Sequence, residues 1–163
     1  RIILMKDKEL LKIVQQEVEN LSSLLKVESE KEVSIEEGEE GVKYLKVNFE
    51  GEELGYMIGN RGRHLDALQF ILQIILGRKL GEEVDFRVFV DVAGYRKEKD
   101  DKLEQMALEK ADNARILGEP IELPPMKPSD RRIVHLALMK FKDISSESIG
   151  EGMDRRIVIS PIK

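Results

Sequence analysis

The chain has 163 residues, of which 41% are hydrophobic and 36% are charged, enough for one medium or two small packed cores. It contains no cysteine, which excludes disulfide bonds, thiolate zinc sites and cysteine nucleophiles and favours a reducing compartment. The net charge of −5 is unevenly distributed, because residues 55–81 carry +3 and residues 121–163 carry +2. Charges act over only about 8 to 10 Å in physiological salt, so these two segments suit a nucleic-acid partner despite the acidic total. Ordinary variation in a charge-rich surface is the alternative explanation.

No apolar run approaches the length of about 20 residues that a membrane-spanning helix needs, and the first residues lack the pattern of a signal peptide. We therefore expect a cytoplasmic protein that does not insert directly into a membrane. Because residue 1 is arginine and not methionine, we expect a fragment or a processed product.

The first elements are predicted to be a helix and a hairpin. Apolar residues recur at helical spacing after Asp7, which predicts an amphipathic helix over residues 8–26. Residues 33–35 and 42–49 alternate apolar and polar side chains as strands do, and the polar residues 36–41 between them predict a turn.

Two helices around a glycine loop are predicted to follow. Residues 52–57 can form a short helix, which the loop from Gly59 to Gly62 interrupts. A longer helix then presents apolar residues on one side and is expected to end near Gly77. Residues 84–90 alternate as a third strand would, which closes the first group of elements.

The chain contains two Gly-x-x-Gly tetrapeptides, and only one suits a phosphate group. In residues 38–41 the two central residues are glutamates, which repel phosphate, and they lie in the predicted strand turn. Gly59 and Gly62 let a sugar-phosphate chain approach without a Cβ in the way. The N–H groups at the start of the next helix favour an anion, and Arg61 and Arg63 add positive charge. Because about one such tetrapeptide is expected by chance, the order of the elements carries more weight.

This order, together with Ile58-Gly59-Asn60-Arg61-Gly62-Arg63, resembles a type II KH domain, which has the arrangement α-β-β-α-α-β. In that family the loop holds the backbone of about four nucleotides, and the adjoining helix and strand form an apolar groove for the bases. The resemblance implies a first domain over residues 1–93 with a clamp made of Gly59, Asn60, Arg61, Gly62 and Arg63. It implies a groove that includes Ile58, His64, Leu65 and part of the strand 84–90. The alternatives are an exposed loop arginine for Arg61 and a capping or surface histidine for His64.

The second half of the chain predicts a long helix, a shorter helix and a strand pair. Residues 95–117 combine mixed charge with helical spacing of apolar residues, which predicts a helix with a solvated charged face. Residues 121–123 predict a short strand that two prolines stop. A proline then suits the first turn of a helix over residues 129–141, and residues 144–149 and 155–160 predict a closing hairpin.

Arg131 and His135 are four residues apart and therefore share a face of the predicted helix. Residues 126–135, followed by the hairpin with its paired arginines, resemble an R-three-H domain, whose family binds single-stranded nucleic acids. The resemblance implies a second domain over residues 94–163, with helices on a small, mostly antiparallel sheet. The residues expected to contact nucleic acid are Arg131, Arg132, His135, Arg155 and Arg156. The alternative is an intrahelical pair in which Arg131 satisfies a partly buried histidine.

A type II KH domain followed by an R-three-H domain resembles one bacterial family, the Jag or KhpB (SpoIIIJ-associated) proteins, over residues 8–163. The resemblance implies an α+β protein that binds single-stranded RNA, or single-stranded DNA, as an RNA chaperone or post-transcriptional regulator. It implies a small single-KH partner of the KhpA type or a homodimer, and an influence on cell division, cell shape and cell-wall synthesis. Members usually carry a further N-terminal domain that is absent from this sequence. Aromatic residues make up only 5%, which predicts weak discrimination among bases.

Two other functions are compatible with the sequence. The first is an interaction scaffold that uses the KH fold for dimerisation or for association with a membrane insertase. The second is an enzyme, but the sequence has no phosphate-binding P-loop or dinucleotide fingerprint, and its only histidines are His64 and His135. We therefore expect no catalysis, no cofactor and no metal site.

Overall fold

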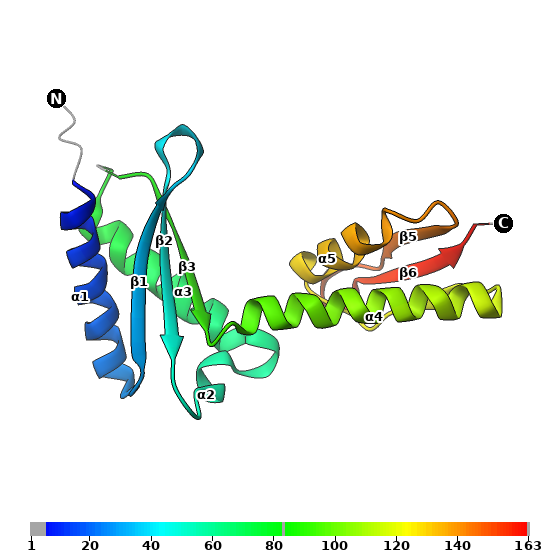
Figure 1. The fold of residues 1–163 in the computed structure, drawn as a ribbon, viewed down its shortest axis with the longest axis horizontal. Helices are drawn as coiled ribbons and strands as arrows, with labels where there is room; N and C mark the ends of the chain where they lie inside the picture. Colours follow the sequence, from blue (N-terminus) through cyan, green and yellow to red (C-terminus); the bar gives the residue numbers. More distant parts are fainter. Residues whose placement is uncertain (1–5, 83, 163) are drawn as a thin grey trace. The chain divides into compact units, whose positions relative to one another are not determined.

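The computed structural model describes residues 6–82 and 84–162. The chain divides into two compact units, Arg1–Tyr95 and Arg96–Lys163, each with its own hydrophobic core. Both units combine helices with a small sheet, so the predicted α+β class is confirmed (Figure 1). Among the described residues, no helix combines the length and the apolar character that crossing a membrane requires.

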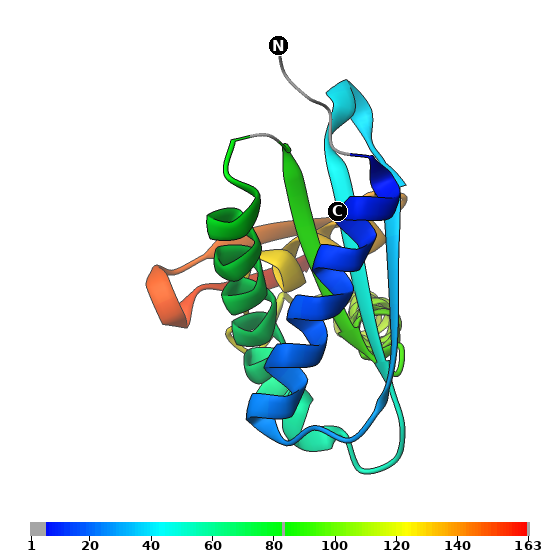
Figure 2. The same cartoon turned by 90° about the vertical axis from the view of Figure 1, so that its left-hand side faces the viewer.

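Unit 1 is a three-stranded sheet with helices on one face (Figure 2). Its strands are β1 (Glu30–Glu37), β2 (Lys43–Glu50) and β3 (Phe86–Val92). Its helices are α1 (Asp7–Leu25), the short α2 (Gly55–Ile58) and α3 (Arg63–Leu80). The central strand β2 pairs antiparallel with β1 and parallel with β3. The order α-β-β-α-α-β is the one expected of a type II KH domain.

The core of unit 1 lies between the sheet and the helices. Alternate residues of a strand face opposite sides, so Leu45 and Val47 of β2 line up with Val88 and Val90 of β3 on the helix side. All four are buried. From α3 the fully buried contacts are Leu65, Leu72 and Leu76. This packing fixes the start of α3, and with it the glycine loop, against the sheet.

Three helices differ from the prediction in their bounds. The helix predicted over residues 129–141 begins at Pro128 and ends at Leu138. Helix α3 continues through Gly77 and ends before Gly81, which takes a φ of 61°. The helix continues because Leu80 is buried, and this packing outweighs the low helix propensity of one glycine. The helix predicted over residues 52–57 shrinks to the single turn of α2, since Glu53 has a φ of 57°, which an α-helix does not accommodate.

Unit 2 consists of two helices and a three-stranded antiparallel sheet in the order β4-β6-β5 (Figure 1). Its strands are β4 (Ile121–Glu122), β5 (Ile144–Ile149) and β6 (Arg156–Pro161). Its helices are α4 (Tyr95–Leu117) and α5 (Pro128–Leu138). The antiparallel sheet agrees with the predicted architecture, and α4 has the predicted bounds. Helix α5 packs against β5 and β6.

The core of unit 2 depends on small residues of α4. Ala107, Ala111 and Ala114 are fully buried and lie at helical spacing on one face. They pack with Val134, Ala137, Leu138, Ile144, Ile157 and Ile159. The small side chains of this face of α4 thus complete a core whose larger residues come from α5 and the sheet. The rest of α4 carries the charged, solvated surface that its composition predicts.

Candidate nucleic-acid interface

The glycine loop of residues 59–62 is a tight turn between α2 and α3. Gly59 has φ 68° and ψ −169°, a region that is essentially restricted to glycine. Arg61 and Gly62 also have positive φ values, 54° and 80°. The backbone therefore reverses within four residues, which places the first N–H groups of α3 beside the loop.

Each glycine of the loop also contacts an aromatic ring. A Cβ on Gly59 would overlap the imidazole ring of His64, and a Cβ on Gly62 would lie 3.0 Å from Cε1 of Tyr95. The imidazole of His64 is held in place, since its Nδ1 lies 2.7 Å from the carbonyl oxygen of Tyr56. Packing against these rings is thus a second reason, besides the turn itself, for glycine at both positions.

We expect Gly59→Ala to destabilise unit 1 by about 3 kcal/mol, because it combines an unfavourable backbone conformation with a clash against His64. The matched control is Gly41→Ala, where φ is 80° and no atom lies within 4 Å of the added Cβ. That control should cost about 1 kcal/mol. Urea unfolding of both variants checks the difference, and equal losses would mean that the His64 contact contributes nothing.

The polar side chains of the loop point into solvent. Asn60, Arg61 and Arg63 are exposed, and within the described part of the chain no hydrogen bond or ion pair engages any of their side chains. No side chain caps the N-terminus of α3, whose N-cap residue is Gly62. The only acid in the first turn of α3 is Asp66. The loop therefore presents two arginines and a helix N-terminus to the same solvent region, an arrangement that attracts an anion.

The other Gly-x-x-Gly segment, residues 38–41, has a similar backbone only in its second half and carries the opposite charge. Gly38 has φ −96°, whereas Gly59 has φ 68°. Glu40 has φ 57°, close to the 54° of Arg61, and Gly41 and Gly62 both have φ 80°. The segment joins β1 to β2, as predicted, and both of its glutamates are exposed. Neither the tetrapeptide pattern nor the positive φ values of its last two residues are therefore specific to the loop at 59–62. The arginines and the following helix distinguish the loop at 59–62.

Two glutamines bridge α3 and β3, where an apolar groove was expected. The N–H group of Val88 donates to Oε1 of Gln73 (2.9 Å), and that of Val90 donates to Oε1 of Gln69 (3.0 Å). Because β3 is an edge strand, its outward N–H groups need acceptors, and α3 supplies them. The space between helix and strand is therefore lined by carboxamides.

The predicted groove residues lie in three different environments. Ile58 is half-buried at the end of α2, and His64 is exposed beside Gly59. Leu65 is 0% exposed, so it supports the loop from within the core and offers no surface to a ligand. Its burial follows from its position on the core-facing stripe of α3.

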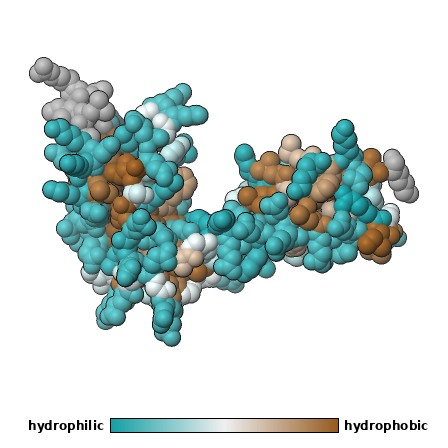
Figure 3. Space-filling model, in the orientation of Figure 1, coloured by the Kyte–Doolittle hydropathy of each residue, from teal (hydrophilic) through white to brown (hydrophobic). Residues whose placement is uncertain are grey.

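A hollow that the sequence did not predict lies beside the loop, between α1, α2 and α3. Its volume is about 290 Å³, and its lining includes Leu25, Tyr56, His64 and Ile71. Further apolar side chains on the outer face of α3 are exposed, namely Phe70 and Ile74. The sequence could have indicated this exposed apolar surface, because the segment that forms α3 is apolar on nearly every side. Hydrophobic side chains reach the surface of both units in the view of Figure 3.

In unit 2, two of the predicted arginines are half-buried and have partners within the fold. The Nη1 of Arg131, which is half-buried, donates to the carbonyl oxygen of Met126 (2.7 Å). The Nε of Arg156 donates to Oε2 of Glu122 (2.7 Å). Arg131 therefore anchors the segment before α5, and Arg156 joins β6 to β4.

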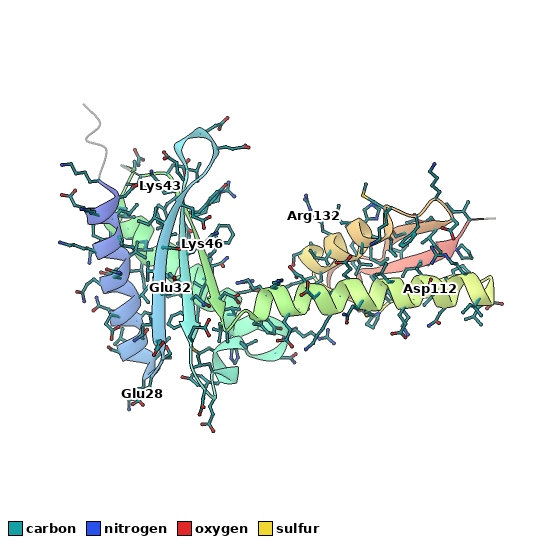
Figure 4. All side chains as sticks on the ribbon, in the orientation of Figure 1. Glu28, Glu32, Lys43, Lys46, Asp112 and Arg132 are labelled. Carbon is teal, nitrogen blue, oxygen red and sulfur yellow. The ribbon has the colours of Figure 1, made fainter. Side chains whose placement is uncertain are left out.

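The other predicted residues of unit 2 are exposed. Nδ1 of His135 lies 2.6 Å from Oγ of Ser146, and Nε of Arg155 donates to Oγ of Ser148 (3.0 Å). Arg132 projects from α5 (Figure 4) and has no partner among residues 6–82 and 84–162. The alternative that a partly buried His135 is satisfied by an intrahelical arginine is wrong, because His135 is exposed and contacts β5.

Within the described residues, no cluster of three or more His, Asp or Glu side chains could hold a metal ion. The loop and the α5 surface instead offer cations and hydrogen-bond donors, which suit a phosphate backbone.

Comparison with known proteins finds related domains in both halves of the chain. Residues 15–88 match the family model described as "KhpA/KhpB, KH domain", and residues 101–161 match the family model of the R-three-H domain. The chain is similar to an RNA-binding protein KhpB of Clostridium symbiosum, with 33% identity over 118 residues, which are 72% of this chain and 52% of that protein. A protein of the same name from Bacillus subtilis (strain 168) is 34% identical over 131 residues, 79% of this chain and 61% of that protein. The match thus spans only about half to three fifths of these relatives' length. With a KH domain of the KhpA/KhpB type followed by an R-three-H domain, the chain belongs to the Jag/KhpB family.

Proposed function

We propose that this chain binds single-stranded RNA through the loop at residues 59–62 and through the exposed face of α5. The proposal rests on the exposed side chains of Arg61, which lies in the glycine turn, and of Arg63, which is the first residue of α3. Guanidinium groups and backbone N–H groups at a helix start are the usual partners of phosphate oxygens. The names of the two relatives, RNA-binding protein KhpB, favour RNA as the ligand.

The proposed protein is a cytoplasmic, non-enzymatic binder that acts as an RNA chaperone or post-transcriptional regulator. Membership of the family supports this role, and supports the proposed influence on cell division, cell shape and cell-wall synthesis. The residues themselves support only the binding step.

The test is the fluorescence anisotropy of a labelled single-stranded RNA, with DNA of the same sequence in parallel, over a series of salt concentrations. We expect affinity to fall as salt rises, with a log–log slope of about −0.7 for each phosphate contacted. Tighter binding of RNA than of DNA would assign the ligand to RNA. Absence of binding to both, or an affinity that salt does not change, would reject the proposal.

The apolar outer face of α3 favours a second function, association with another KH domain. Phe70, Ile71 and Ile74 lie at helical spacing and are 66%, 44% and 43% exposed. Tyr56 and Leu25 continue this surface around the hollow that they share with Ile71. Exposed apolar patches of this kind commonly mark protein interfaces. We propose that the patch binds a small single-KH protein of the KhpA type or a second copy of this chain, and the shared KhpA/KhpB family model supports that choice.

We expect Phe70→Gln/Ile74→Gln to abolish this association, because it removes much of the apolar surface without changing the charge. Sedimentation velocity of the chain, alone and with a single-KH protein, measures the loss. Met153→Gln is the control, since Met153 is 82% exposed in the other unit and should not affect association. If the double variant associates as tightly as the wild type, the patch is not the interface.

A further inference from the structure

Three residues of α5 and its C-cap residue Met139 form one continuous exposed surface on unit 2. Arg132 and Leu136 are four residues apart, and so are His135 and Met139. Arg132 is three residues from His135, and Leu136 is three residues from Met139. Because residues three or four apart are neighbours on a helix surface, the four side chains lie together. Leu136 is 50% exposed and Met139 is 66% exposed. We call this group the α5 strip. It combines two large apolar side chains with an arginine and a histidine.

The α5 strip contains no acid, although the whole chain carries a net charge of −5. The single acidic residue of α5, Asp130, is only 8% exposed and pairs with Lys99 on α4. Arg132 therefore meets no carboxylate on its own helix surface. A partner that approaches the strip encounters positive charge beside apolar surface, which suits an anionic ligand that also has apolar faces.

The orientation of His135 supports the same ligand. Its Nδ1 faces Oγ of Ser146, so the ring is fixed against β5 and its Nε2 edge is directed away from that contact. Two residues further along the same face of β5, Ser148 accepts a hydrogen bond from exposed Arg155. Hydrogen-bonding groups and cations thus line the strip on the side of the hairpin.

We propose that Leu136 and Met139 contact the faces of unpaired bases while Arg132 holds the adjoining phosphate, so that the α5 strip is a base-contacting surface for single-stranded RNA. Each nucleotide offers both an anionic phosphate and a flat, weakly polar base, which matches the alternation of the strip. The chain has no tryptophan and few other aromatic residues, so aliphatic side chains and the polarizable sulfur of Met139 replace ring stacking. This proposal depends on the proposed function that the chain binds RNA.

The apolar and charged parts of the strip contribute differently to binding. Contacts of Leu136 and Met139 with bases release no counterions, so they should strengthen binding equally at every salt concentration. A phosphate contact of Arg132 should appear in the salt dependence. This separates base contact by the strip from general electrostatic attraction.

The test is RNA anisotropy on the whole chain over a salt series, with Leu136→Ser/Met139→Ser compared to wild type. We expect a roughly five- to tenfold loss of affinity at each salt concentration and an unchanged slope. Arg132→Gln should instead reduce the magnitude of the slope by about 0.7. The matched control is Ile116→Ser/Leu117→Ser, which removes an even more exposed apolar pair at the end of α4 and should bind as wild type does.

If Leu136→Ser/Met139→Ser binds as tightly as wild type while wild-type binding depends on salt, the base-contact proposal is wrong and RNA binding itself stands. An equal loss in the control pair would also overturn it. If wild type binds no RNA, the proposed function fails first. If the double variant does not fold, methyl NMR of the wild type with labelled methionines tests whether Met139 contacts RNA. The Met139 signal should shift during RNA titration, and a signal that stays fixed at saturation would reject the contact.

Discussion

Asn60→Asp/Arg61→Asp is expected to reduce RNA affinity by roughly tenfold or more at moderate salt. The double change shifts the charge of the loop by −3 and places two carboxylates where phosphate oxygens would lie. The fold should tolerate it, because aspartate is nearly isosteric with Asn60 and tolerates the left-handed conformation of residue 61, where φ is 54°. Anisotropy measures the loss, and circular dichroism checks that the variant is folded.

The second Gly-x-x-Gly segment provides a control within the same chain. Glu39→Asn/Glu40→Arg gives residues 38–41 the same tetrapeptide sequence as residues 59–62, on a turn whose last two residues have similar φ values. It shifts the charge by +3 but adds no helix N-terminus, because β2 follows. We expect only a small gain in RNA affinity from general attraction. A gain as large as the loss in Asn60→Asp/Arg61→Asp would show that charge alone determines binding.

Lys99→Met is expected to destabilise unit 2 by about 3 kcal/mol, the largest effect on stability that we predict from one side chain of α4. The Nζ of Lys99 lies 2.6 Å from Oδ1 of Asp130, and the two side chains are only 18% and 11% exposed. Removing the lysine leaves a nearly buried carboxylate without its cation, which costs far more than losing an exposed pair. Urea unfolding followed by circular dichroism measures the change.

The control for Lys99→Met is Lys102→Met, which lies one turn further along α4. Lys102 pairs with Glu98, and both side chains are well exposed, at 71% and 63%. Its loss should cost less than about 1 kcal/mol. If both variants lose the same stability, the Lys99–Asp130 pair does not anchor α5. Because Asp130 directly precedes the residues of the predicted R-three-H contact, Lys99→Met should also weaken RNA binding through α5.

Local patterns in the sequence predict the long elements and the position of the loop. Helix α4 has the predicted bounds because helical spacing extends over 23 residues without a break. The end of α3 could not be predicted, because it depends on whether Leu80 finds a buried site, and that is a tertiary property. The glycine pattern located the turn at 59–62, but its contact with Tyr95 joins residues far apart in the chain.

The sequence identifies which residues belong to the candidate site, but it does not predict which of them are exposed and which are bonded within the fold. The pattern identifies Arg131 and Arg132 equally, yet only the fold determines that Arg131 bonds to Met126 while Arg132 remains exposed. In the same way, the sequence cannot predict that Gln69 and Gln73 would cap the edge of β3, since strand order determines which N–H groups need acceptors.

We propose that the loop at residues 59–62 holds the RNA backbone, and the decisive measurement is amide NMR of the chain during titration with a short single-stranded RNA. We expect the N–H signals of Asn60, Arg61, Gly62 and Arg63 to shift most, and to saturate at the same RNA concentration as the anisotropy signal. If these four signals stay fixed while RNA is bound, the loop is not the clamp and the binding site lies elsewhere on the chain.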